Sequence, residues 1–220
     1  MSIHRDGHIP EGVIERLPAY LNVLLQLRKE GDGTVSSARL GELTSVNPAQ
    51  IRRDLTHFGQ FGTRGVGYDI AMLIERIQHI LGSHHAHRMV LVGAGHLGTA
   101  IASYDGLKTR GFKIVGVFDN NPARIGIRAG DIVVRDVSEL PRVVREQSVQ
   151  IGVIAVPADA AQDVADLMVS AGVRVILNYS SAMVRAPAQV TVHNTDPVRE
   201  LLHTLYYLSK ADEVAGAPRQ

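Results

Sequence analysis

The chain of 220 residues contains no cysteine. This absence excludes disulfide bonds, thiol switches and cysteine-ligated metal centres. A protein of this composition that senses the redox state of its surroundings must therefore do so by binding a diffusible cofactor.

Long apolar runs and a charge excess are also missing. No run approaches the roughly 20 apolar residues that cross a bilayer, and residues 1–6 lack the apolar core of a signal peptide. We therefore expect a cytoplasmic protein. The net charge is +1, so any binding to nucleic acid must come from a local basic patch rather than from overall charge.

Hydrophobic periodicity divides the chain into two parts. Residues 10–82 have the pattern of short helices joined by tight turns, whereas residues 88–195 alternate between strand and helix patterns. This arrangement predicts an α/β protein. The expected divisions are a helical domain over residues 1–82, a linker over 83–87, an α/β domain over 88–196, a C-terminal helix over 197–211 and a flexible tail over 212–220.

The first part contains the signals of a helix-turn-helix. A long helix is predicted from residue 10 to about residue 30, and Pro18 should kink or restart it. Ser36 or Ser37 can cap a short second helix. After a tight turn, Asn47 followed by proline begins a third helix. Two helices joined by a short turn predict a DNA-binding arrangement.

The third helix, residues 48–58, has two different faces. At about 100° per residue, Ile51, Leu55 and Phe58 share one face and should be buried. The other face and its flank carry the candidate DNA-binding residues Gln50, Arg52, Arg53, Thr56 and His57. Arginine can donate two hydrogen bonds to guanine or pair with phosphate. The alternative is a solvated surface, on which Asp54 lies beside the two arginines.

A glycine-rich segment follows the third helix. Residues 59–67 contain four glycines, which suit a tight hairpin. In a helix-turn-helix protein this hairpin would be the wing. Arg64 at its tip could reach a minor groove or a phosphate.

The second part begins with a dinucleotide-binding motif. The apolar strand over residues 89–92 leads into Gly93-Ala94-Gly95-His96-Leu97-Gly98, and a helical pattern follows. This is G-x-G-x-x-G in its required strand–turn–helix context, and it predicts that residues 88–196 form a Rossmann domain. The first glycine allows the tight turn, the second lets the backbone approach a pyrophosphate, and the third lets the helix pack on the strand. The helix N-terminus supplies N–H groups to the phosphates.

An acidic residue follows at the expected distance. The next strand, over residues 113–118, ends at Asp119, about 20 residues after Gly98, where a carboxylate accepts the ribose hydroxyls. The same charge would repel the 2′-phosphate of NADP, so NAD is favoured. Later strands are predicted over residues 132–134, 151–156, 175–177 and 190–192. Val156, Pro157 and Asn178 then lie at strand ends, where a nicotinamide would sit.

Taken together, these residues resemble the Rex family of redox-sensing transcriptional repressors over nearly the whole chain. The resemblance is carried by residues 9–11, 16–20, 51–55, 58–59, 64–68, 93–98, 104, 118–119, 156–157, 161–162, 176–178 and 196. It implies a homodimer that binds palindromic operator DNA when NADH is scarce. Binding of NADH would then release the DNA, so the repressor would respond to the ratio of NADH to NAD⁺.

The resemblance also implies roles for particular residues. Tyr104 should lie near the nicotinamide, and Arg16 and Asp196 should form state-dependent polar contacts at the domain boundary. The C-terminal helix, with apolar residues at helical spacing from 198 to 210, should insert between the domains of the partner. Periodicity alone leaves open the alternative that this helix packs on its own domain.

Other functions remain as alternatives. An NAD-dependent oxidoreductase needs a substrate domain, but only about 25 residues follow the last strand. His193 is the late histidine nearest a strand end, and we expect it to be structural rather than catalytic. A coenzyme A-binding module is disfavoured by Asp119. The histidines of residues 84–87 lack an obvious fourth ligand, so we expect no metal site. With His193 structural and no substrate domain, we also expect no catalytic residue.

Overall fold

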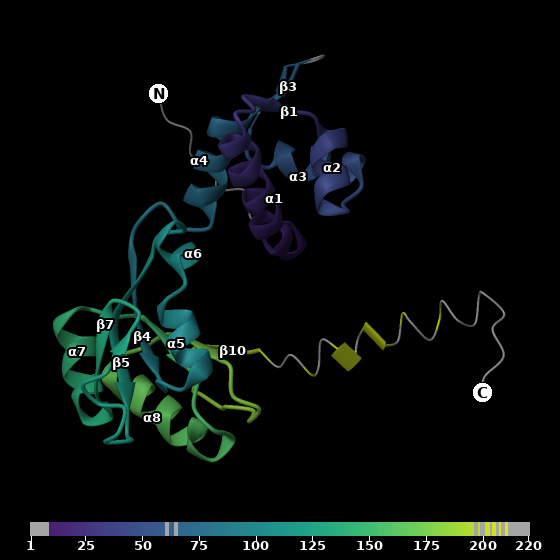
Figure 1. Ribbon diagram of the computed structural model, residues 1–220. Coiled ribbons are helices and arrows are strands. Elements are labelled where there is room, and N and C mark those ends of the chain that lie inside the picture. Colours follow the sequence, from purple (N-terminus) through teal and green to yellow (C-terminus); the bar gives the residue numbers. More distant parts are fainter. Residues whose placement is uncertain are drawn as a thin grey trace, which may run out of the picture. The chain divides into compact units, whose positions relative to one another are not determined.

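The computed structural model describes residues 9–59, 62–63 and 66–195, and within the C-terminal segment residues 198, 201–202, 204–205, 207 and 210. The chain forms two compact units, which divide between His85 and Ala86 (Figure 1). The division falls inside the predicted linker, whose last residue, His87, already begins a strand.

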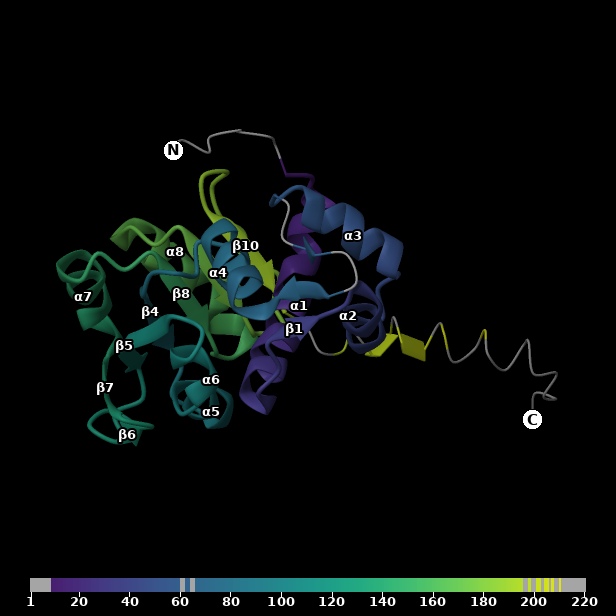
Figure 2. The same cartoon turned by 90° about the horizontal axis from the view of Figure 1, so that it is seen from above.

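The N-terminal unit combines helices with a small antiparallel sheet. Its elements are α1 (Glu11–Glu30), β1 (Thr34–Val35), α2 (Ser37–Thr44), α3 (Pro48–Thr56), β2 (Gly62–Thr63), β3 (Gly67–Asp69) and α4 (Ile70–Ile80). The sheet order is β1-β3-β2, so β2 and β3 form the predicted wing hairpin. Helices α2 and α3 follow one another and pack together (Figure 2). The predicted winged helix-turn-helix is therefore confirmed.

Local capping sets the ends of these helices. The Ser36 hydroxyl accepts a hydrogen bond from the Arg39 amide at 3.0 Å, and the Asn47 side chain accepts one from the Ala49 amide at 2.8 Å. The prediction that α1 restarts at Pro18 is wrong, because the helix runs unbroken through it. A proline removes only one backbone donor, and α1 is held by a buried face that includes Leu17, Leu21 and Leu24.

The second unit is built on a mainly parallel sheet. Its strands are β4 (His87–Val92), β5 (Phe112–Asp119), β6 (Arg128–Ala129), β7 (Ile132–Asp136), β8 (Ile151–Ile154), β9 (Val175–Asn178) and β10 (Thr191–Asn194). Its helices are α5 (His96–Ala102), α6 (Asp105–Lys108), α7 (Leu140–Glu146) and α8 (Ala161–Ala171), with short 3₁₀ turns at Val137–Glu139 and Ala158–Ala160. The short antiparallel edge strand β6 was not predicted.

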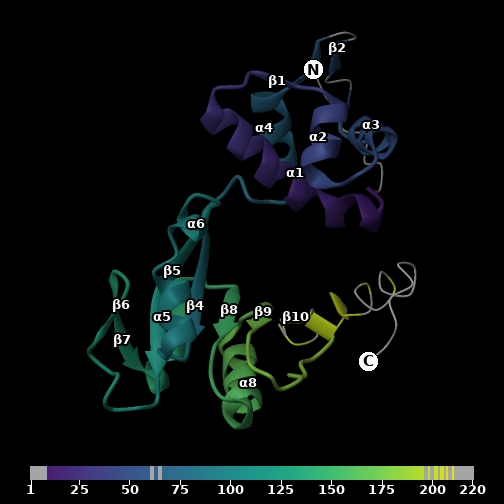
Figure 3. The same ribbon diagram turned by 45° about the vertical axis from the view of Figure 1, so that its right-hand side comes forward.

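Strand order identifies the fold. The sheet reads β10-β9-β8-β4-β5-β7-β6, and Figure 3 shows β5, β4, β8, β9 and β10 side by side in that sequence. From β4 the chain builds outward through β5 and β7, then returns to the other side of β4 through β8. This is the doubly wound Rossmann arrangement, so the predicted fold class is confirmed. Its crevice opens beyond the carboxyl ends of β4 and β8, where the order reverses.

Alternation along β4 creates the layers of this unit. Met89 and Leu91 belong to a buried cluster that also contacts Ile101 and Ala102 of α5. Val90 and Val92 belong to a separate cluster with residues of α7 and α8. Because successive side chains of a strand point to opposite faces, one apolar strand supplies both sides of the core.

The described residues of the C-terminal stretch are helical. Their large apolar side chains are more than half exposed in the single chain: Val198 59%, Leu201 64%, Leu202 62%, Leu205 54% and Tyr207 58%. In the part of the chain that the structure describes, no helix has both the length and the apolarity required to span a membrane.

Candidate nucleotide-binding and DNA-binding sites

Two glycines of the G-x-G-x-x-G motif, Gly93 in the loop after β4 and Gly98 inside α5, are required by the protein itself. Gly93 has φ of 104°, in the left-handed region, and a Cβ there would overlap the backbone carbonyl of Ala155. A Cβ at Gly98 would overlap the carbonyl of Gly93. Both positions therefore need glycine for the turn and for packing of α5 against β4.

Gly95 is different from its neighbours in the loop. A Cβ built on Gly95 would meet nothing closer than Nη1 of Arg124, at 3.9 Å. Packing of this chain therefore gives no reason for glycine at this position. A bare Cα beside open space fits the close approach of a pyrophosphate, which is the role predicted for Gly95.

Gly93 of this loop lines a pocket of about 450 Å³. Gly93, Asp119, Arg124, Val156 and Pro157 are among its lining residues, together with residues of the turn that precedes α8. This volume lies within the range of ligand sites in proteins, about 300–1,000 Å³. The structure thus brings Val156 and Pro157 to the same pocket as the glycine loop.

Asp119, which lines this pocket, is held by a network of hydrogen bonds. Its Oδ2 accepts a hydrogen bond from the Ala94 amide at 2.7 Å and pairs with Nη1 of Arg124 at 3.2 Å. Its Oδ1 accepts one from the Asn121 amide at 2.9 Å. Burial alone would raise the pKa of Asp119, but these hydrogen bonds and the Arg124 charge outweigh it and lower the pKa below its ordinary value.

Other predicted cofactor residues have different surroundings. His96 and Leu97 are exposed at the start of α5. Asn178 is fully buried, with its Nδ2 donating to Ala182 O and Asn194 Oδ1, and its Oδ1 accepting from Ser180. All hydrogen-bonding positions of this amide are used within the protein. Asn178 therefore fixes the loop after β9, and its side chain has no group left for a cofactor.

Tyr104 lies beyond the opposite end of α5 from the glycine loop. Helix α5, which spans roughly 10 Å along its axis, lies between Tyr104 and Gly95. Its ring lines another pocket of about 420 Å³, which is mostly apolar and includes Leu107, Phe112 and Ile132. A single chain therefore does not bring Tyr104 into the pocket of the glycine loop.

The outer face of α3 agrees with the predicted DNA-binding surface at four positions. Arg52, Arg53, Thr56 and His57 are all exposed. Nη1 of Arg52 also donates to the Ser37 hydroxyl at 3.0 Å, which joins α3 to the start of α2. Gln50 is only partly exposed. Arg64 and Asp196 lie outside the described residues.

Asp54 is not part of a solvated surface, which corrects the alternative considered for this helix. It is 1% exposed, and both its oxygens are paired. Nε and Nη2 of Arg16 donate to Asp54 at 2.7 and 2.8 Å. The Tyr20 hydroxyl and the Gln50 amide each donate at 2.7 Å. The two predicted site residues, Arg16 and Gln50, thus converge on one buried carboxylate that links α1 to α3.

The pKa values in this cluster follow from its geometry. Burial would raise the pKa of Asp54, but the hydrogen bonds from Arg16, Tyr20 and Gln50 lower it below its ordinary value. The hydrogen bond to Asp54 is the main reason that the pKa of Arg16 is raised. Burial, followed by the same carboxylate, raises the pKa of Tyr20.

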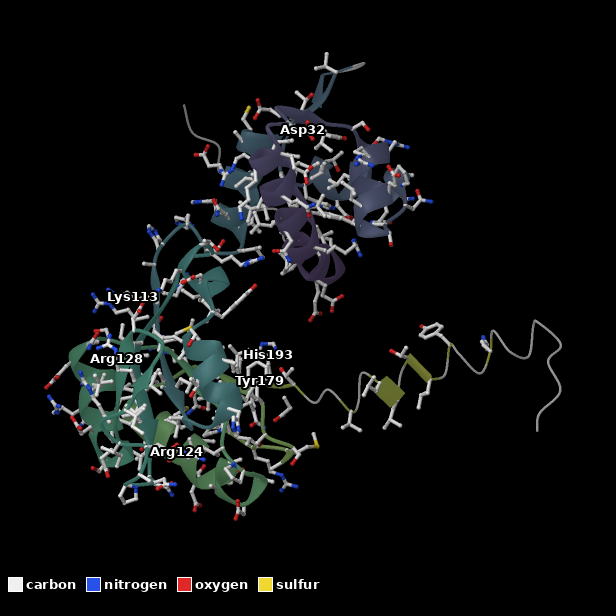
Figure 4. All side chains as sticks on the ribbon, viewed as in Figure 1. Asp32, Lys113, Arg124, Arg128, Tyr179 and His193 are labelled. Carbon is white, nitrogen blue, oxygen red and sulfur yellow. The ribbon has the colours of Figure 1, made fainter. Side chains whose placement is uncertain are left out.

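The histidines considered as catalytic or metal-binding residues lie apart from these sites. His193 is exposed on β10 opposite Leu177, close to Tyr179 at the end of β9 (Figure 4). It does not line the pocket of the glycine loop. The rings of His84 and His85 contact each other, with centroids 3.9 Å apart. Within the described ranges, no group of three or more acidic or histidine side chains is arranged to hold a metal ion.

Sequence reasoning did not identify Arg124 or Tyr20 as site residues, and it did not show that the backbone amides of Ala94 and Asn121 hold Asp119. Arg124 lies in a loop without periodicity, so no pattern marks it. Tyr20 falls on the buried face of α1, where a tyrosine is expected for packing alone. Only the folded structure shows that both side chains donate to buried carboxylates.

Comparison with known proteins agrees with the two units. A family model described as "Putative DNA-binding protein N-terminus" matches residues 8–56, and one described as "CoA binding domain" matches residues 84–182. The redox-sensing transcriptional repressor Rex of Rubrobacter xylanophilus is 51% identical over 207 residues, covering 94% of this chain and 96% of that protein. The Rex protein of Chloroflexus aurantiacus is 46% identical, covering 93% and 96%.

Solved structures give the same result. The structure of RSP with β-NAD⁺ and operator DNA has a TM-score of 0.84 and 33% identity, covering 97% of this chain and 100% of that one. RSP with β-NADH has a TM-score of 0.83 and 32% identity, covering 96% and 99%. RSP is described as a Rex-family repressor. With full-length relatives at this identity and both units matched in order, the chain belongs to the Rex family of redox-sensing transcriptional repressors.

Proposed function

We propose that this chain is a repressor that binds palindromic operator DNA as a homodimer when NADH is low and leaves the operator when NADH binds. The observation that carries the proposal is that a single chain combines two features. These are exposed arginines on the outer face of α3 and a glycine loop in which Gly95 faces open space. The relative RSP has been solved with NADH, and with NAD⁺ and operator DNA.

Each unit has a defined task in this proposal. Arg53, with Arg52, Thr56 and His57, contacts the operator from α3, and Arg64 contacts it from the wing. The glycine loop holds the diphosphate of the dinucleotide and Asp119 its adenosine ribose. The nicotinamide supplies the signal, because its oxidised and reduced forms differ in charge. Since only differential contacts can shift an equilibrium, residues around the ring must distinguish the two forms.

The exposed apolar stripe of the C-terminal helix supports a dimer. Leu201 and Leu202 are among its most exposed members, and burial of such side chains contributes about 1.5–3 kcal/mol each. A two-fold dimer engages a palindrome only when its recognition helices are about one DNA turn apart, or a multiple of that. If the C-terminal helix is swapped between protomers, it would change the spacing of the recognition helices when NADH binds. Arg16 and Asp196 would make the contacts that differ between the DNA-bound and the NADH-bound states.

The central experiment measures operator binding by fluorescence anisotropy while NADH and NAD⁺ are titrated separately. We expect NADH to release the DNA at concentrations at which NAD⁺ does not. Coenzyme A serves as a third ligand, because the second unit matches a CoA binding domain. Release by coenzyme A but not by NADH would contradict the proposal, and so would an affinity for operator that no nucleotide changes.

Two further measurements test the parts of the proposal. We expect no oxidation of NADH above background with common carbonyl substrates, since the cofactor acts as a signal and no catalytic residue is assigned. Deletion of residues 198–220 should give a monomer or loose dimer with poor operator binding, as judged by sedimentation and anisotropy. Deletion of residues 212–220 alone is the matched control and should leave both properties unchanged.

A further inference from the structure

The carboxylate of Asp119 is nearly saturated before any ligand binds. A carboxylate has about four lone-pair positions. Three of them accept hydrogen bonds from Ala94, Asn121 and Arg124. A ribose diol offers two hydroxyl groups, so it needs one position more than Asp119 has left. One of the three present donors must give way.

Arg124 is the donor that can move most easily. The Ala94 and Asn121 amides belong to the backbone, at 2.7 and 2.9 Å, whereas the Arg124 contact is longer, at 3.2 Å, and comes from a flexible side chain. The Arg124 side chain is 46% exposed, while Asp119 is 4% exposed. Displacing the arginine therefore leaves the aspartate in place and costs little packing.

The guanidinium of Arg124 already lies beside the open side of Gly95. The position of a Cβ on Gly95 is 3.9 Å from Nη1 and 4.0 Å from Nη2 of Arg124. Any phosphate that approaches the bare Cα of Gly95 therefore comes within reach of this cation. Hydrogen bonds between a guanidinium and phosphate oxygens are charge-assisted and can be bidentate.

From these contacts we infer that Arg124 is a diphosphate-binding residue, which the ribose hydroxyls displace from Asp119 and which then pairs with the dinucleotide phosphates. This inference rests on the proposed function, since it names a further residue of the same nucleotide site. Arg124 exchanges one anionic partner for another, so its positive charge stays paired in both states. Its effect falls on affinity for the diphosphate and not on the choice between NADH and NADPH.

The test measures binding of NADH and NADPH to the full chain by calorimetry at low and high salt. Arg124→Ala should weaken both nucleotides about tenfold, the factor for one charge-assisted hydrogen bond at a partly exposed site. The loss should shrink as salt rises, and Arg124→Lys should recover part of the affinity, because a lysine keeps the charge. The melting temperature without nucleotide should change little.

Arg128→Ala is the matched control. Arg128 lies in the same unit but away from Arg124 (Figure 4), and its Nη2 donates to the Asp131 carbonyl at 2.7 Å. This variant should bind both nucleotides as the wild type does. Unchanged NADH affinity in Arg124→Ala overturns the inference, and so does a loss confined to NADPH, which would assign Arg124 to the 2′-phosphate. Failure of the wild type to bind NADH would instead contradict the proposed function.

Discussion

The two units each contain a buried aspartate, and the two carboxylates are used differently. Asp54 accepts hydrogen bonds from Arg16, Tyr20 and Gln50 at all of its lone-pair positions. Asp119 keeps one position open and is held mainly by backbone amides. A saturated carboxylate fixes structure, here the packing of α3 on α1, whereas an unsaturated one that lines a pocket can still bind a ligand. Side chains therefore hold Asp54 in the N-terminal unit, whereas Asp119 in the second unit is held by two backbone amides and one side chain.

The largest effect is expected where backbone builds the site. Gly98→Ala places a methyl group against the Gly93 carbonyl and should destabilise the second unit by more than about 3 kcal/mol. Gly95→Ala meets no such obstacle and should fold normally but bind NADH at least about tenfold more weakly. Urea denaturation and calorimetry measure the two effects. Equal loss of stability in both variants would show that Gly95 is also structural.

Truncation of a side chain should matter most in the N-terminal unit. Arg16→Ala leaves the Asp54 charge buried without its main partner and should cost about 3 kcal/mol of unfolding free energy. Arg124→Ala removes an exposed partner from Asp119 and should cost less than about 1 kcal/mol. Denaturation of the two variants gives the comparison directly. If the two losses were similar, the distinction between saturated and unsaturated carboxylates would not hold.

Operator binding tests whether α3 presents its outer face to DNA. Arg53→Ala should weaken specific binding by about 1–3 kcal/mol if Arg53 contacts a base. Arg145→Ala, an exposed arginine in α7 of the other unit, is the control and should have no effect. Anisotropy with operator and with unrelated DNA separates loss of base contact from loss of general charge. Full operator affinity in the Arg53 variant would remove α3 from the interface.

The smallest expected effect is a change in how the stability depends on pH in the acid range. Because the folded pKa of Asp54 is below its ordinary value, its charge stabilises the native state above about pH 4 and this contribution is lost as the pH falls through the folded pKa. Asp54→Asn should be less stable near neutrality and should lose less stability on acidification. Asp32→Asn, at an exposed position, should follow the wild type. Parallel pH profiles for all three proteins would contradict this account of Asp54.

Much of the fold could be predicted because its signals are local. The alternation of strands and helices, the caps at Ser36 and Asn47 and the motif from Gly93 to Gly98 all depend on neighbouring residues. The prediction of a break at Pro18 failed because tertiary packing along α1 outweighs one missing hydrogen bond. The edge strand β6 has two residues, which is too short for any periodic signal.

The sequence by itself determined the order of the two units, the helix-turn-helix, the Rossmann sheet and the position of the nucleotide loop. Periodicity and glycine placement act over a few residues, so they survive without knowledge of the fold. Only the tertiary structure decided that Asp54 is buried, that Asn178 has no free polar group and that Arg124 lies between Asp119 and Gly95. Asp54 pairs with Arg16, Asn178 pairs with Asn194, and the Arg124 guanidinium lies beside Gly95, and each of these contacts joins residues far apart in the chain. Arg124 and Asp119 are close in sequence, but a loop without periodicity joins them. Neither kind of side-chain contact leaves a periodic trace in the sequence.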